Sequence, residues 1–263
     1  MKGVVTLTTD FGERDGYVGQ MKGIILGINP DACIVDITHE ITPYSIMEGA
    51  LALRGVVKCF SFPSYHVAVV DPGVGGVRRP VAVRTGSSYL IGPDNGIFSL
   101  LLNELAEYEA RSIENSAFMA PAISRTFHGR DIFAPAAAKL SLGYDFRDVG
   151  PLVTDLTGLV EPEKIKSSDG IWGEIIHVDR FGNLISNIER SEVEGVTLEV
   201  SCGPINVDRL SSCYSDSTPL SPIALTNSYD LLEIALPNDN ASRKYGINTG
   251  AKVNVRLKKS HPA

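Results

Sequence analysis

Apolar residues in the first half of the chain fall alternately into short dense runs and into longer segments with helical spacing. The dense runs predict strands at 3–9, 32–38, 66–71, 80–86 and 88–93, and the spaced segments predict helices at 15–29, 45–60, 96–108 and 130–143. Strands separated by such helices are typical of βαβ units. We therefore expect an α/β N-terminal domain, with a mostly parallel sheet and helices on both faces.

The pattern changes after about residue 150. Residues 151–170 are rich in Pro, Gly, Ser and charge and lack a long helical period, which is typical of a connection. The short β-like runs that come next are spaced by turn-forming residues and lie at 171–179, 183–188, 195–203, 230–236 and 251–257. This is the pattern of a small all-β barrel or sandwich, and we expect a barrel. We expect domains at 1–158 and 159–263, with a linker at about 152–170.

Composition excludes several kinds of partner. The 263 residues carry a formal charge of −7, and the basic residues are scattered, which disfavours nucleic acid and anionic membranes as partners. No window approaches the ~20 apolar residues of a membrane span. The four cysteines form no CxxC pair, and we expect Cys33 and Cys59, which lie in apolar runs, to be buried. A cytoplasmic location is the expectation that follows.

Acidic residues close three of the predicted strands: Asp10, Asp36 and Asp71. A single aspartate in such a place is commonly a turn former, because its side chain bonds nearby backbone N–H groups. Ligands of open α/β sheets, however, bind beyond the carboxyl ends of the strands, so several acids at one edge favour a binding site. The glycines after Asp71, in "DPGVGG", would let a ligand approach the backbone closely.

That glycine turn does not predict a phosphate site. A dinucleotide fingerprint needs a helix after its glycines, whereas "VRRPVAV" follows here as a turn and a strand. The chain also has no HExxH motif, no calcium-loop spacing and no GxSxG elbow. No metal site is indicated, although Mg²⁺ held by Asp10 and Asp71 stays open as an alternative.

His128 is the leading candidate among the histidines. It precedes Gly129 and a predicted helix whose first turn contains Asp131, where an imidazole can project into a crevice. Simple helix capping would explain the same arrangement, and His39 is a second candidate. In the second half, Asp179 and Asn183 flank a probable turn, and turn formation alone would account for them.

These stretches together resemble the S-adenosyl-L-methionine (SAM) hydroxide adenosyltransferases, which are related to the SAM-dependent fluorinases and chlorinases. The resemblance covers nearly the whole chain and rests on "TLTTDFGERDGYVGQMKG", "IVDITHEITPYSIMEGA", "VVDPGVGGVRRPVAV", "GPDNGIFS", "TFHGRDIFAPAAA", "GEIIHVDRFGNLISNI" and "NSYDLLEIA". It implies an N-terminal α/β domain, a C-terminal β-barrel, and a homotrimer whose sites lie between neighbouring subunits.

The resemblance also implies roles for particular residues. An Asp–Arg–His set that acts on water matches Asp71, Arg78 and His128. Asp10 matches a residue that binds the ribose hydroxyls, and Tyr44 matches an aromatic residue beside the ribose. The remaining substrate contacts implied are Asp179 and Ser228 at the methionine end, Asn183 at adenine, and the weaker matches Glu233, Asn240 and Ala241.

The activity implied is hydrolysis of SAM to adenosine and L-methionine, without a metal or redox cofactor. The substrate could be the biologically inactive sulfonium epimer, which residues alone do not decide. Two alternatives stay open. A halogenase of the same superfamily is disfavoured by Asp71, since the halogenases have an aromatic residue there and a carboxylate repels halide. A non-catalytic nucleoside-binding module would bind without turnover and would tolerate Asp71→Ala.

Overall fold

A computed structural model describes residues 3–60, 62–195, 197–216, 218 and 220–257. The chain divides into two compact units, Met1–Val160 and Glu161–Ala263, and each is described by itself. Residue 196, within the strand expected at 195–203, lies outside the described residues.

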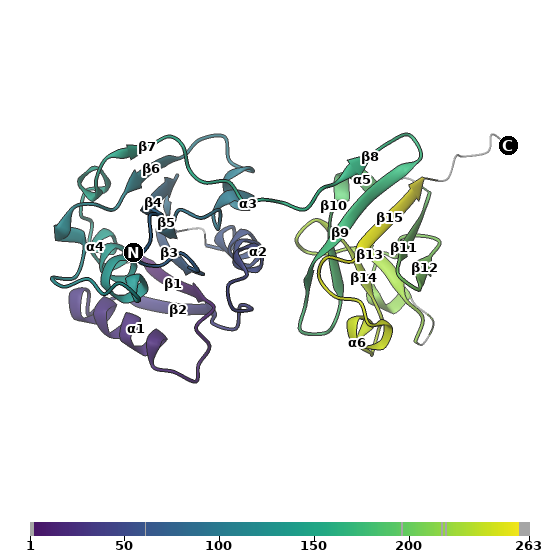
Figure 1. Cartoon of the computed structure of the whole chain (residues 1–263), viewed down its shortest axis with the longest axis horizontal. Coiled ribbons are helices and arrows are strands. Elements are labelled where there is room, and N and C mark those ends of the chain that lie inside the picture. Colours follow the sequence, from purple (N-terminus) through teal and green to yellow (C-terminus); the bar gives the residue numbers. More distant parts are fainter. Residues whose placement is uncertain (1–2, 61, 196, 217, 219, 258–263) are drawn as a thin grey trace. The chain divides into compact units, whose positions relative to one another are not determined.

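The first unit contains a mixed sheet with the strand order β2-β1-β3-β5-β4-β6-β7 (Figure 1). Its strands are β1 (Val4–Thr9), β2 (Cys33–Thr38), β3 (Ser64–Val69), β4 (Pro80–Thr85), β5 (Ser88–Pro93), β6 (Glu109–Ser112) and β7 (Leu152–Val153). The pairs β1–β2, β1–β3 and β3–β5 are parallel, whereas β4 is antiparallel to both β5 and β6. The predicted α/β domain with a mostly parallel sheet is confirmed.

Helices cover both faces of this sheet. They are α1 (Tyr17–Ile28), α2 (Ile46–Val57), α3 (Ser99–Leu102) and α4 (Ala134–Ser141). The helices α1 and α4 pack on one face over Val5 and Leu7, and α2 and α3 pack on the other over Ala68 and Val70 (Figure 1). The central strands β1 and β3 therefore have both of their faces buried, which explains their nearly continuous apolar sequences.

The register of β1 and β3 fixes the position of two acids. Thr9 pairs with Val69, so both strands reach the same level at their carboxyl ends. Asp10 follows β1 directly and Asp71 follows β3 after Val70. The sheet therefore brings these two carboxylates to one edge, as expected for an open α/β sheet.

The second unit is a nearly closed antiparallel barrel, which confirms the predicted all-β domain (Figure 1). Its strands are β8 (Ile165–Lys166), β9 (Gly170–Val178), β10 (Leu184–Glu189), β11 (Leu198–Cys202), β12 (Ile205–Val207), β13 (Ile223–Thr226), β14 (Leu231–Ala235) and β15 (Lys252–Leu257). The main order is β12-β11-β15-β9-β10-β14-β13, and an isolated bridge joins Leu210, which follows β12, to Ala224 in β13. Two short helices, α5 (Arg190–Val193) and α6 (Ala241–Tyr245), complete the unit.

Three local expectations are wrong. The helix expected at 96–108 is confined to α3, because the amides of Glu104 and Leu105 bond three residues back and tighten the chain into turns. Cys33 and Cys59 are exposed rather than buried. Cys33 begins the edge strand β2, and Cys59 follows the end of α2, so neither apolar run places its thiol in the core.

Candidate functional site

A pocket of about 310 Å³ lies at the carboxyl ends of β1 and β3 in the first unit. Four of the residues expected at a site line it: Asp10, Tyr44, Asp71 and His128. The chain segments that reach it follow β1, precede α2, follow β3 and precede α4. The sheet edge thus collects side chains that are far apart in the sequence.

Arg78 connects Asp71 to His128. Its Nε donates to Asp71 Oδ1 at 3.0 Å, and its Nη2 donates both to Asp71 Oδ2 and to His128 Nδ1, the latter at 2.7 Å. The Asp71 and Arg78 side chains are only 5% and 10% exposed, and the guanidinium lies over the Phe133 ring. A fork-shaped pair of this kind fixes the position and the orientation of the carboxylate.

The same contact assigns the protons of His128. A guanidinium has donors only, so Nδ1 must accept and the neutral ring carries its proton on Nε2. Burial, and then the charge of Arg78, hold the pKa of His128 below its ordinary value of 6.5. His128 is therefore neutral near pH 7, with an N–H on its other nitrogen available as a hydrogen-bond donor.

The π-helical turn Gly129–Phe133 carries His128 at its start. Asp131, in that turn, accepts the amide of Ser124 at 2.8 Å and binds Arg130. These bonds tie the 124–131 segment into a fixed shape. Wide turns of this type are frequent at functional sites.

The glycine turn after Asp71 packs against another loop of the protein at Gly75. Gly75 has φ +73°, and a Cβ built there would lie 2.2 Å from the carbonyl oxygen of Arg125. The segment carrying Arg78 therefore rests directly on the backbone that leads to His128. Gly75 thus serves this contact between loops, and close approach of a ligand to the other glycines of the turn stays a prediction.

Asp10 and Tyr44 are joined at the other side of the pocket. The Tyr44 amide donates to Asp10 Oδ2 at 2.9 Å, and Tyr44 has φ 69°, which is uncommon for an aromatic residue. The residue is 73% exposed. The carboxylate of Asp10 thus holds an aromatic ring at the pocket in a conformation that the backbone alone disfavours.

Sequence reasoning missed an aromatic wall in this pocket. Phe11, Tyr17 and Phe127 line it and contact one another, with ring centroids 5.2 to 5.8 Å apart. Phe11 and Tyr17 lie in the stretch "DFGERDGY" beside Asp10, so proximity to a candidate acid was the available signal. Asp36, by contrast, lies inside β2, where its carboxylate contacts Lys22 and His39, and it does not line the pocket.

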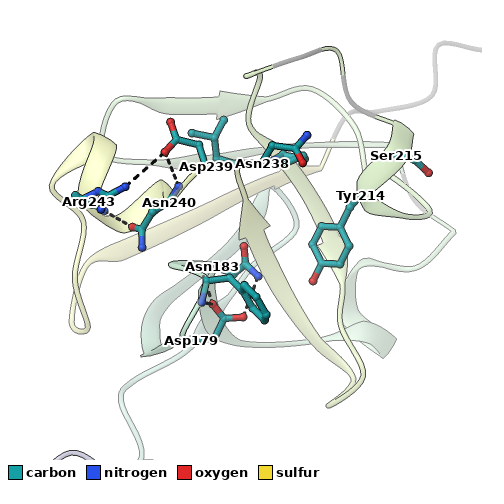
Figure 2. Close-up of a pocket in the computed structure, with 11 residues that line it drawn as sticks. Asp179, Asn183, Tyr214, Ser215, Asn238, Asp239, Asn240 and Arg243 are labelled. Carbon is teal, nitrogen blue, oxygen red and sulfur yellow. Dashed lines mark hydrogen bonds and ion pairs between the residues drawn. The ribbon is translucent and has the colours of Figure 1, made fainter.

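The second unit has a larger pocket of about 820 Å³ (Figure 2). Asp179, Asn183 and Asn240 line it, together with the exposed ring of Phe181. Asp179 Oδ1 accepts the amides of Phe181 and Asn183, and its Oδ2 accepts the Asn183 side chain at 2.9 Å. Asn240 caps α6 by accepting the Arg243 amide (Figure 2).

The other three candidates in this unit do not line that pocket. Glu233 is buried and accepts from the Tyr214 hydroxyl at 2.7 Å and from the side-chain amide of Asn227 at 3.2 Å, and burial raises the pKa of its carboxyl. Ser228 is exposed, and the Ala241 side chain is buried in the barrel core. Tyr214 does line the pocket, so Glu233 is bonded to a lining residue without lining the pocket itself.

Within the described residues, no group of three His, Cys, Asp or Glu side chains is arranged to hold a metal ion. Nor does any helix in the described part of the chain combine the length and apolar character needed to cross a membrane.

Comparison with known proteins identifies the family. The model of the SAM hydroxide adenosyltransferase N-terminal domain matches residues 5–150, and that of the C-terminal domain matches residues 173–254. The chain belongs to the SAM hydroxide adenosyltransferase family. The resemblance read from the sequence motifs is thereby confirmed.

Members and relatives of this family match over nearly their full length. The (R)-S-adenosyl-L-methionine hydrolase of Methanocaldococcus jannaschii is 37% identical, over 93% of this chain and 92% of that protein. A fluorinase of Actinoplanes is 26% identical, over 96% and 97%. The crystal structure of an uncharacterized conserved protein from Thermotoga maritima superposes with a TM-score of 0.87 at 30% identity, over 96% and 99%. The chain is thus related along its length to hydrolase and fluorinase enzymes.

Proposed function

We propose that this SAM hydroxide adenosyltransferase hydrolyses (R)-S-adenosyl-L-methionine to adenosine and L-methionine. The observation that carries the proposal is the Asp71–Arg78–His128 network at a pocket that also holds Asp10 and Tyr44. The relative from Methanocaldococcus jannaschii, named for hydrolysis of the R epimer, supports the choice of epimer. Aromatic faces attract cations, so the aromatic wall of Phe11, Tyr17 and Phe127 suits a sulfonium.

The reaction is a displacement at the ribose C5′ carbon. A water oxygen forms a bond to C5′ while the C5′–S bond breaks, and the electron pair goes to sulfur, so that neutral methionine leaves. The proton of the water passes to Asp71 and then to solvent. Holding the water in line with the C–S bond can supply roughly 7–11 kcal/mol of the barrier in favourable cases.

The three residues have different tasks in this step. Asp71 accepts the proton, and Arg78 holds the Asp71 carboxylate in place through the paired charge. His128 orients the water by donating from Nε2, because its Nδ1 already accepts from Arg78. His128 is thus a positioning donor in the proposal and not the base.

The substrate contacts extend this proposal. Asp10 binds the ribose hydroxyls and Tyr44 packs beside the ribose, while Asp179 and Ser228 hold the methionine end and Asn183 reads adenine. Glu233, Asn240 and Ala241 are weaker assignments: the buried Ala241 side chain leaves only its backbone to contact a ligand. The homotrimer with sites at subunit interfaces stays a prediction, which light scattering coupled to size-exclusion chromatography tests.

Product analysis tests the function. The protein is incubated with the R and the S epimer separately, each with and without chloride, and the products are separated by chromatography. We expect adenosine and methionine from the R epimer, at a rate that chloride does not change. Chlorinated adenosine would support the halogenase alternative, and bound but unconverted substrate would support the binding module. The same incubation is carried out with Asp71→Asn, which should lose adenosine formation. Asp145→Asn removes the same charge from an exposed ion pair with Arg147 and is the matched control.

A further inference from the structure

His39 is a buried histidine that the proposed mechanism does not use. It follows β2 and its side chain is only 3% exposed. Its Nδ1 lies 2.9 Å from Thr9 Oγ1 and its Nε2 lies 3.0 Å from Asp36 Oδ1. The ring does not line the pocket, so its contacts point to an indirect role.

The direction of these contacts follows from the chemistry of the partners. Asp36 also binds Lys22 Nζ, and although burial acts to raise the pKa of Asp36, its contacts with Lys22 and His39 hold that pKa below the ordinary value. The contact between His39 Nε2 and Asp36 Oδ1 has the distance of an ion pair but not the geometry of a hydrogen bond. The negative charge of Asp36 nevertheless favours the tautomer of His39 that carries its proton on Nε2. Nδ1 then accepts the hydroxyl proton of Thr9, whose oxygen in turn accepts the Phe11 amide at 3.3 Å.

His39 also holds this turn through its backbone. Its carbonyl oxygen accepts the Gly12 amide at 2.8 Å. His39 thus fixes two backbone amides. It holds the Gly12 amide directly and the Phe11 amide through the hydroxyl of Thr9. Asp10 lies between Thr9 and Phe11, and its carboxylate holds the Tyr44 amide. The contacts of His39 with Thr9 and Gly12 therefore lie on either side of Asp10 in the sequence, and Asp10 in turn holds Tyr44.

We propose that His39 is a positioning residue, which acts together with Thr9 and Asp36. It fixes the carboxylate of Asp10 and the ring of Tyr44 in the positions in which they bind the ribose of the substrate. This inference rests on the proposed function, because it takes the ribose as the group that Asp10 and Tyr44 receive. The network is separate from the Asp71–Arg78–His128 contacts. It acts on substrate binding, whereas those contacts act on the water.

A matched pair of variants at Thr9 tests the network. Thr9→Val keeps the β-branched shape and removes the hydroxyl, while Thr9→Ser keeps the hydroxyl. We expect Thr9→Val to raise KM for the R epimer and Kd for adenosine about tenfold with a smaller change in kcat, since a buried acceptor on His39 loses its donor. Thr9→Ser should stay near the wild type.

A double-mutant cycle shows whether the effect passes through Asp10. The losses of adenosine affinity for Thr9→Val and Asp10→Asn should not add, because both changes disturb the same carboxylate, whereas Thr9→Val and Asp71→Asn should add in kcat/KM. Equal KM and Kd values for Thr9→Val and Thr9→Ser would overturn the positioning role. So would additive losses for Thr9→Val and Asp10→Asn.

Hydrogen exchange separates this inference from the proposed function. The amides of Phe11, Gly12 and Tyr44 should exchange faster in Thr9→Val than in Thr9→Ser, whatever the enzyme turns over. A wild type without turnover would remove the proposed function. Unchanged exchange in Thr9→Val would remove the His39 network itself.

Discussion

Gly75→Ala tests whether the packing of Gly75 on Arg125 holds the Asp71–Arg78–His128 network together. The new methyl group would lie 2.2 Å from the Arg125 carbonyl oxygen, whereas ordinary van der Waals contacts begin at 3.4 Å. The Arg78 segment and the segment leading to His128 must therefore separate by about 1 Å, a displacement that can cost ~10²-fold in rate. The left-handed φ of +73° adds about 1–2 kcal/mol of backbone strain.

Gly86→Ala is the matched control. Gly86 has φ +60° in the turn between β4 and β5, and a Cβ there meets nothing within 4 Å. It therefore carries the strain without the collision. Initial rates of adenosine formation from the R epimer, and unfolding in urea, are measured for both variants. We expect Gly86→Ala to lose stability but keep its rate, and Gly75→Ala to lose both. Equal rates for the two variants would refute the packing argument.

Three further predictions follow from the contacts and charges. Asp71→Asn, Arg78→Ala and His128→Ala should each lower turnover by ~10²-fold or more in a protein that remains folded by circular dichroism; unchanged rates in all three would remove the network from the mechanism. The acid limb of kcat/KM should lie below pH 6.5, because activity needs neutral His128 and its pKa is lowered; a limb above pH 6.5 would contradict this. Burial lowers the pKa of His66 to about 4, with Thr6 and Ser64 bonded to its two ring nitrogens. As pH falls from 6.5 to 4, His66 takes up a proton in the unfolded chain but stays neutral in the folded protein. The free energy of unfolding should therefore fall by about 3 kcal/mol. His66→Gln should flatten this dependence in urea titrations, and an unchanged slope would contradict it.

The architecture could be predicted because it depends on local pattern. The apolar runs of β1 and β3 are buried on both sides, and the short runs after residue 170 form the barrel. The apolar pattern gave wrong predictions where the burial of a residue depends on which other elements pack against it. Cys33 lies in an apolar run, but its strand is at the edge of the sheet, and the apolar residues at 96–108 fill the core through turns.

The site could be predicted only in part. Position at a strand end indicated Asp10 and Asp71, but it also indicated Asp36, which binds Lys22 and His39 instead. Arg78 and His128 are 50 residues apart, and only the family resemblance linked them before the structure showed their contact. The contact of Gly75 with the Arg125 carbonyl depends on two loops meeting in space, and no sequence spacing encodes it.

The central claim is that water attacks the ribose carbon of the R sulfonium at the Asp71 carboxylate. The most direct measurement is turnover of (R)-S-adenosyl-L-methionine in oxygen-18-labelled water, with mass spectrometry of both products. The account predicts the label in the 5′-hydroxyl of adenosine, none in methionine, and loss of labelled adenosine in Asp71→Asn. Adenosine without the label, or labelled adenosine formed equally fast by Asp71→Asn, would contradict it.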